Sequence, residues 1–190
     1  MEKDKIKKLL REGGETNQIS RIAIFDFDGT TMDTLTPETG IPIYKAKTGK
    51  DWPFKGWWGR AESLNMNIFD FKPLPEVKAA FNKERANNNT LMVSLTGRRK
   101  KLSGEVEAVL HANGYRFDRY LYNYGADTLS NKIEQITNLL KEFPTVRTIY
   151  MADDRNEHVP VFKEFLDKLV KSGRLDDYDF THVYNEQWTK

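Results

Sequence analysis

Residues 22–30 read Ile-Ala-Ile-Phe-Asp-Phe-Asp-Gly-Thr, a short apolar run that changes abruptly into two acids and a glycine. Four apolar residues in a row are typical of a strand that is buried on both faces of a parallel sheet. Asp26 and Asp28 stand two positions apart before Gly29, so a sharp turn there would let both carboxylates face one pocket. Such a segment could also be a simple turn, but the further ligands of an EF-hand calcium loop are not at the required offsets.

Four further short runs of apolar or β-prone residues follow along the chain, at 91–95, 120–122, 148–151 and 180–184. Helical patterns lie between them, with apolar stripes within 77–81, 106–110, 133–140 and 162–169. The last four strands begin roughly 30 residues apart, which is the size of one strand–helix–strand unit. This alternation predicts an α/β fold, a doubly wound parallel sheet with helices on both faces.

The interval between the first two strands is too long for this repeat. It is about 65 residues, and a helix at 75–88 accounts only for its end. The remaining part, about 34–73, is rich in Pro, Gly and aromatic residues and exceeds the length of an ordinary loop. We therefore predict a small cap inserted at 34–73 within a core of residues 21–190, preceded by a basic tail or helix at 1–20.

The composition is that of a globular protein: 190 residues, 38% hydrophobic and 31% charged, with a net charge of +2. This charge balance does not by itself suggest nucleic acid, so a basic binding surface would have to be local. The absence of cysteine excludes disulfides, thiolate catalysis and Cys-based zinc sites. Because no long apolar run and no secretory signal is present, we expect a cytoplasmic protein without membrane association.

Ligands of open parallel sheets bind at the carboxyl ends of the strands, so the residues after each apolar run are the most informative. Thr96 and Gly97 follow the second run and could offer a hydroxyl and a backbone N–H to an anion, although a capping Thr is the alternative. Asp153 and Asp154 follow the fourth run. Two adjacent acids at a buried strand end repel each other, and a cation would relieve that repulsion.

Together these groups could form a centre for phosphoryl transfer. Carboxylates from the first and fourth strands can hold Mg²⁺, which prefers oxygen ligands. A carboxylate nucleophile, a second carboxylic acid, a hydroxyl donor and a lysine are what transfer through an aspartyl-phosphate requires. The metal and Lys132, near the start of a helix, would offset the charge that repels a carboxylate from a phosphate.

The segments FDFDGT, SLTGR, Lys132 and YMADDR resemble the four motifs of the haloacid dehalogenase (HAD) superfamily, in the same order, over roughly residues 21–170. The resemblance implies a Rossmann-like HAD core and a magnesium-dependent phosphatase. In such an enzyme Asp26 would attack phosphorus, while Asp28 would protonate the leaving oxygen and then activate water.

The same resemblance implies two sets of ligands. Those for the phosphoryl oxygens would be Thr96, Gly97 and Lys132. Those for Mg²⁺ would be Asp26, the Asp28 carbonyl and Asp153, with Asp154 helping directly or through water.

A narrower resemblance is to the HAD domains of the Swiss Army Knife RNA repair proteins. It rests on GWWGR at 56–60, LTGR at 95–98, FDRYLYN at 117–123 and DDRNEH at 153–158. Those domains favour Glu-Asp-Arg where this chain has Asp153-Asp154-Arg155, which leaves open which acid binds the metal. The resemblance implies a phosphorylated substrate, either a nucleotide or a nucleic-acid end.

Residues 44–60 contain five basic residues against one acid, interleaved with five aromatic residues. That composition is typical of single-stranded nucleic-acid binding, but tryptophans in a small insertion can equally form its miniature core. The candidates for contact with the substrate are Trp58, Arg98, Arg155 and His158. For His158 the alternative is a capping or supporting role at the start of a helix.

The leading hypothesis is hydrolysis of a phosphomonoester with Mg²⁺, on a terminal phosphate of a nucleotide or a nucleic acid. The alternative enzyme is a phosphatase for small metabolites such as a sugar phosphate or a free nucleotide. A third hypothesis is a non-catalytic binding module built on the same fold. The sequence indicates no obligate protein partner.

Overall fold

Five parallel strands form the centre of the molecule, in the order β5-β4-β1-β6-β7. The structure, a computed structural model, describes residues 18–184, so the predicted N-terminal tail or helix lies outside the described residues. The strands span Arg21–Phe25 (β1), Thr90–Arg99 (β4), Arg119–Asn123 (β5), Thr148–Asp153 (β6) and Asp177–His182 (β7). Each neighbouring pair runs parallel, which confirms the predicted α/β sheet.

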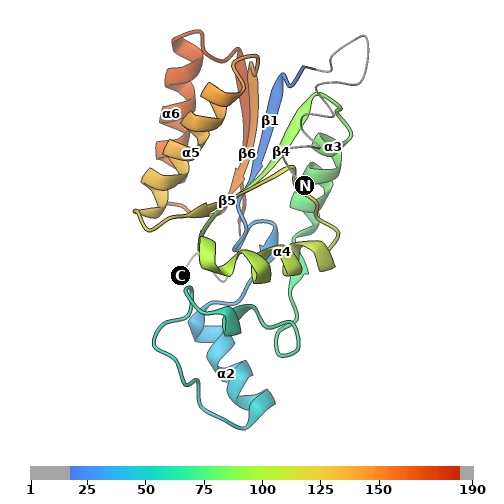
Figure 1. Cartoon of the computed structure of the whole chain (residues 1–190), viewed down its shortest axis with the longest axis vertical. Coiled ribbons are helices and arrows are strands. Elements are labelled where there is room, and N and C mark those ends of the chain that lie inside the picture. Colours follow the sequence, from blue (N-terminus) through green and yellow to red (C-terminus); the bar gives the residue numbers. More distant parts are fainter. Residues whose placement is uncertain (1–17, 185–190) are drawn as a thin grey trace.

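Helices cover both faces of this sheet (Figure 1). They span Pro75–Arg85 (α3), Ser103–Ala112 (α4), Thr128–Glu142 (α5) and Val159–Lys171 (α6), with a short 3-10 turn at Lys100–Leu102 (η2). Successive side chains of a strand point to opposite faces. Ile22 and Ile24 of β1 accordingly share a buried cluster with residues of α5 and α6, whereas Ala23 and Phe25 share the other cluster with residues of α3 and α4. The sheet is therefore doubly wound, as predicted.

Two strands, β4 and β7, differ most from their predicted bounds. β4 continues beyond the apolar run to Arg99, and its pairing with β5 changes register between Leu95 and Arg99. Thr96 and Gly97 therefore lie within an irregular strand end rather than after it. β7 begins at Asp177, ahead of the predicted run, because an edge strand with one hydrogen-bonded neighbour tolerates exposed polar residues.

The chain between β1 and α3 leaves the sheet and forms a separate lobe beside the strand ends (Figure 1). Its elements span Met32–Asp33 (β2), Pro37–Thr48 (α2), Ala61–Leu64 (the 3-10 helix η1) and Lys72–Pro73 (β3). β2 and β3 pair in antiparallel fashion and bring the two ends of this lobe together. We call residues 34–73 the insertion segment.

Aromatic packing holds the insertion segment together. Trp57 is only 3% exposed, and its Nε1 donates a hydrogen bond to the carbonyl of Leu35 at 2.8 Å. Its ring lies against Gly40, where a Cβ would come within 2.2 Å of it, so no larger residue fits there. The Trp52 ring stands 4.8 Å from that of Trp57. Trp52 and Trp57 thus form a miniature core, which was the alternative to nucleic-acid binding for the tryptophans of this segment. Trp58, in contrast, is 38% exposed.

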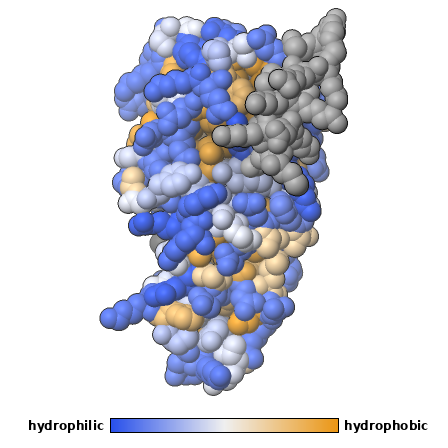
Figure 2. All heavy atoms as spheres, in the orientation of Figure 1, coloured by the Kyte–Doolittle hydropathy of each residue, from blue (hydrophilic) through white to orange (hydrophobic). Residues whose placement is uncertain are grey.

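The face of the molecule in Figure 2 is mainly hydrophilic, with apolar residues in small patches. On α2 the Lys45 ammonium lies 2.8 Å from the Asp51 carboxylate, so part of the basic charge of the insertion segment is paired within it. Within residues 18–184, no helix has both the length and the apolar character needed to cross a membrane.

Candidate active site

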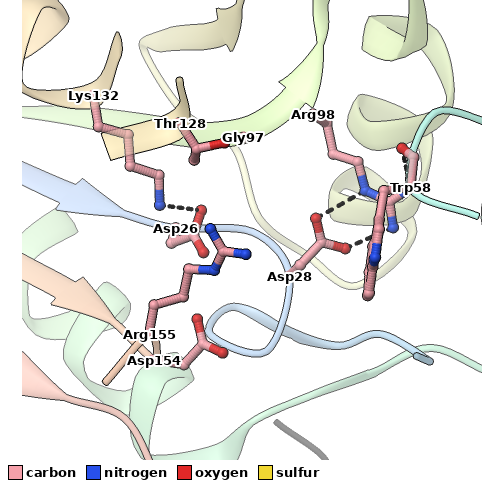
Figure 3. A pocket seen from close by; sticks show the side chains of 9 residues that line it. All are labelled: Asp26, Asp28, Trp58, Gly97, Arg98, Thr128, Lys132, Asp154 and Arg155. Carbon is pink, nitrogen blue, oxygen red and sulfur yellow. Dashed lines mark hydrogen bonds and ion pairs between the residues drawn. The ribbon is translucent and has the colours of Figure 1, made fainter. Parts of the chain in front are cut away.

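A cavity of about 230 Å³ lies at the carboxyl ends of β1, β4 and β6, where the insertion segment meets the sheet (Figure 3). Its lining residues are Asp26, Asp28, Trp58, Gly97, Arg98, Thr128, Lys132, Asp154 and Arg155. Three acids and three basic residues thus share one small space. The topology explains this, because the ends of adjacent parallel strands meet at one edge of a sheet.

Asp26 and Lys132 form the buried centre of this cavity. Asp26 directly follows β1, and Lys132 reaches it from α5 with Nζ 2.9 Å from Oδ1. The same Nζ lies 2.7 Å from Oδ2 of Asp153. Burial by itself lowers the pKa of Lys132. The two carboxylates outweigh this effect and raise the pKa overall, so the ammonium stays charged.

Three acids, Asp26, Asp153 and Asp154, bring carboxylate oxygens within 4.8 Å of one another. Oδ1 of Asp154 accepts a bond from Thr30 Oγ1 at 3.3 Å, but its buried Oδ2 has no hydrogen-bond partner. Burial, together with the neighbouring carboxylates, raises the pKa of Asp26 to about 7 and that of Asp154 to about 8, although Lys132 opposes the rise. A divalent cation would relieve the repulsion and occupy the unpartnered oxygen, so these residues fit Mg²⁺.

The carboxylate of Asp28 points away from these acids and toward the insertion segment (Figure 3). Its two oxygens accept bonds from Nε and Nη2 of Arg98, each at 2.8 Å. Oδ1 also accepts a bond from Thr34 Oγ1 at 2.8 Å. The side chain of Asp28 thus stands apart from the acid triad, and a metal contact from this residue would use its backbone carbonyl.

The end of β4 and the start of α5 form the opposite wall. Thr96 is buried, and its Oγ1 accepts a bond from the backbone N–H of Arg98 at 3.1 Å. A Cβ on Gly97 would come within 2.9 Å of the methyl group of Thr128, so glycine keeps this wall closely packed. Sequence reasoning missed Thr128, although its position four residues before Lys132 places both on one face of a helix.

The predicted substrate contacts separate into two groups. Trp58, Arg98 and Arg155 line the cavity, whereas His158 does not. His158 immediately precedes α6, at its N-cap position, and its Nε2 lies 3.4 Å from Nη1 of Arg155. Burial lowers the pKa of His158 and favours its neutral form. The position of His158 outside the cavity agrees better with a supporting role at the start of a helix than with contact to the substrate.

A family model described as HAD domain family 1 in Swiss Army Knife RNA repair proteins matches residues 47–189, most of the chain. The chain belongs to this family. The match covers the last three of the four motifs but not the first, and membership confirms the resemblance to these HAD domains and a HAD-type, phosphatase-like fold. HAD proteins generally use Mg²⁺, which agrees with the buried acid triad.

Three proteins similar to this HAD domain share little of its sequence. The uncharacterized protein YMR265C of Saccharomyces cerevisiae is 26% identical over an alignment of 178 residues, and the match covers 80% of this chain and 38% of the yeast protein. A chain of the Pnkp1/Rnl/Hen1 RNA repair complex has a TM-score of 0.54 at 16% identity, over 92% of this chain and 45% of that one. The HAD domain of effector protein Lem4 from Legionella pneumophila has a TM-score of 0.53 at 14% identity, over 91% of both chains.

These structural similarities show a shared HAD fold. The chain spans less than half the length of the yeast relative and of the matched chain in the RNA repair complex.

Proposed function

We propose that this HAD domain is a Mg²⁺-dependent phosphomonoester hydrolase that acts through an aspartyl-phosphate on Asp26. The observation that carries the proposal is the environment of this carboxylate. It faces a cavity, lies 2.9 Å from the Lys132 ammonium and shares a buried cluster with two further acids. A nucleophile beside a fixed positive charge and a cation site is suited to attack on a phosphoryl group.

In the first step an oxygen of Asp26 forms a bond to phosphorus while the bond to the leaving oxygen breaks. Asp28, which reacts in its protonated form, gives its proton to that leaving oxygen. In the second step a water molecule gives a proton to Asp28 and attacks phosphorus. The Asp26–phosphorus bond then breaks, which releases phosphate and restores both carboxyl groups.

Asp26, Asp153 and Asp154 would hold Mg²⁺, together with the backbone carbonyl of Asp28. When bound, the ion would offset the negative charge of the phosphoryl oxygens. The ammonium of Lys132, beside Asp26 and Asp153, adds a fixed positive charge.

Thr96 and Gly97 would bind the transferred group from the β4 side. The Thr96 oxygen already accepts a backbone hydrogen bond, so its own proton is what it would offer to a phosphoryl oxygen. Gly97 lines the cavity, and its backbone N–H would bind the same group.

For the substrate we propose a terminal phosphate on a nucleotide or a nucleic-acid strand. The family description names RNA repair proteins. Trp58 and Arg155 line the cavity and would contact the part of the substrate that does not react. A partly exposed indole suits a base, because every base has a face on which it can stack.

The size of the cavity favours a second candidate. A volume of about 230 Å³ is below the usual range for drug-sized ligands and would admit a small phosphorylated metabolite almost completely. A nucleic-acid strand would instead have to extend past Trp58 onto the surface.

A substrate screen distinguishes these candidates. The purified chain would be assayed with Mg²⁺ against sugar phosphates, mononucleotides and oligonucleotides with 3′ or 5′ phosphates. We expect turnover that requires Mg²⁺ and is fastest on phosphorylated oligonucleotides. Faster turnover of sugar phosphates would favour the metabolite candidate, and no turnover of any phosphate would contradict the enzyme proposal.

A further inference from the structure

Arg98 connects the insertion segment to the cavity through one buried guanidinium. Nε and Nη2 donate to the two oxygens of Asp28, both at 2.8 Å. On its other side Nη1 donates to the carbonyl of Trp58 at 2.8 Å and to Oγ of Ser63 at 3.0 Å. The Trp58 ring also lies over the guanidinium, 5.0 Å from ring centroid to Cζ.

The Arg98 guanidinium restricts the positions of the groups that it joins. Its side chain is 2% exposed, and the planar fork fixes the direction of every hydrogen bond that it donates. Removing one partner of a buried ion pair is strongly unfavourable, so Arg98 and Asp28 should move together. Because Trp58 and Ser63 hold the opposite side, a displacement of the insertion segment should also displace the Asp28 carboxylate.

We propose that Arg98 is a positioning residue that couples the Asp28 carboxylate to Trp58 and the insertion segment. This inference rests on the proposed function, in which Asp28 delivers a proton to the leaving oxygen. The leaving group is also the part of the substrate that would contact Trp58. A substrate seated against Trp58 therefore holds the guanidinium, and thereby the proton donor, in place. Proton delivery then depends on Arg98, whereas attack by Asp26 does not.

Two leaving groups separate these steps. An alkyl phosphate such as a nucleoside monophosphate needs a proton on its leaving oxygen, whereas 4-nitrophenyl phosphate releases a stable anion. In single-turnover assays we expect Arg98→Lys, which keeps the charge but loses the fork, to slow alkyl phosphate cleavage roughly tenfold or more beyond any effect on 4-nitrophenyl phosphate. Asp28→Asn should show the same selectivity, and the double variant should lose no more than Asp28→Asn alone.

Other results would overturn this assignment. Equal losses on both substrates would mean that Arg98 only supports the fold. Losses that multiply in the double variant would mean that Arg98 acts independently of Asp28, for example by touching the substrate itself.

A stability measurement tests the coupling without enzyme activity. Melting temperatures would be compared for Asp28→Asn, Ser63→Ala and their combination, first in the parent chain and then in an Arg98→Met background. We expect non-additive losses in the parent and additive losses once the guanidinium is gone. Additive losses in the parent would refute the coupling. If the parent chain were inactive but the losses in melting temperature were non-additive, the proposed function would be refuted. The coupling of Asp28 to the insertion segment through Arg98 would still stand.

Discussion

At the scale of the residue, the buried triad of Asp26, Asp153 and Asp154 has more carboxylates than the ammonium of Lys132 can balance. Lys132 contacts Asp26 and Asp153, and Asp154 adds a third carboxylate whose Oδ2 has no partner. Such a cluster is costly to desolvate unless a further cation shares it. The imbalance that disfavours the metal-free cluster is therefore what would attract Mg²⁺.

We expect Asp26→Asn to abolish Mg²⁺-dependent phosphatase activity while the chain stays folded. An amide cannot form the acyl-phosphate, so the rate should fall by several powers of ten. The matched control is Asp51→Asn, because this acid lies on the surface of the insertion segment with 86% of its side chain exposed. Steady-state assays and melting temperatures of both variants check the prediction. Substantial turnover by a folded Asp26→Asn protein would contradict an aspartyl-phosphate mechanism.

Substitutions of Lys132 and of Asp153 should reduce activity by different mechanisms, although the two side chains contact each other. Asp153→Asn weakens a metal ligand, so a higher Mg²⁺ concentration should restore part of the activity. Lys132→Met keeps the volume but removes the fixed charge at the transferred group, which added Mg²⁺ should not replace. Titrating Mg²⁺ against initial rate for each variant checks this. Equal rescue of both variants would show that the assigned roles are wrong.

The sequence predicted which residues gather at the cavity better than it predicted their contacts. Strand ends indicated Asp26, Gly97 and Asp154, which all line the cavity, because parallel strands end at a common edge. The paired hydrogen bonds from the Arg98 guanidinium to Asp28 depend on the path of the chain at the end of β4. No local sequence pattern specifies that path. The roles assigned to these residues remain predictions.

At the scale of the element, apolar runs predicted strand existence but not every strand end. Runs found β1 and β6 well, because both are buried between neighbours and their cores are uniformly apolar. They placed β7 too late, since an edge strand alternates with exposed residues. Periodicity also could not show that Trp57 is buried while its neighbour Trp58 is partly exposed, because the insertion segment has no long regular element around them.

The two adjacent tryptophans give a matched pair for testing the insertion segment. Trp58→Ala should slow cleavage of a phosphorylated oligonucleotide roughly 5- to 150-fold, the equivalent of about 1–3 kcal/mol of base stacking. It should hardly affect a small generic phosphate, whose leaving group does not reach Trp58. Measuring kcat/KM for both substrates checks this.

Trp57→Ala should behave differently, because its side chain is buried in the miniature core. It should lower the melting temperature by roughly 6 °C or more and impair both substrates alike. If Trp58→Ala gave the same general loss, Trp58 would be structural and the stacking proposal would fail. If the parent already turned over oligonucleotides poorly, the metabolite candidate would gain.

At the scale of the whole molecule, the fold builds the acid triad from strands that are distant in sequence. Asp26 directly follows β1 and Asp153 ends β6, and these two strands are hydrogen-bonded neighbours at the centre of the sheet. Lys132 reaches the same point from α5. A cation bound there would therefore join elements that only tertiary structure brings together, so its binding should stabilise the entire fold.

Metal binding should accordingly be visible in the melting temperature, with a pH dependence of predictable sign. At a hundredfold excess over its Kd, Mg²⁺ contributes about 2.7 kcal/mol, which corresponds to roughly 5–11 °C for a chain of this size. Burial raises the pKa of Asp26 to about 7 and that of Asp154 to about 8. The stability that a raised carboxyl pKa contributes is complete below its ordinary value of about 4 and is lost as the pH rises through the folded value.

In EDTA the melting temperature should therefore fall between pH 6 and pH 8.5, because the acids lose their protons while still buried together. Mg²⁺ should oppose this fall and shift the melting temperature more at pH 8.5 than at pH 6, where protons compete for the same oxygens. Asp154→Asn should remove most of the Mg²⁺ shift, whereas the exposed control Asp51→Asn should keep it. A shift that is absent in the parent, or unchanged in Asp154→Asn, would mean that the triad is not where the cation binds.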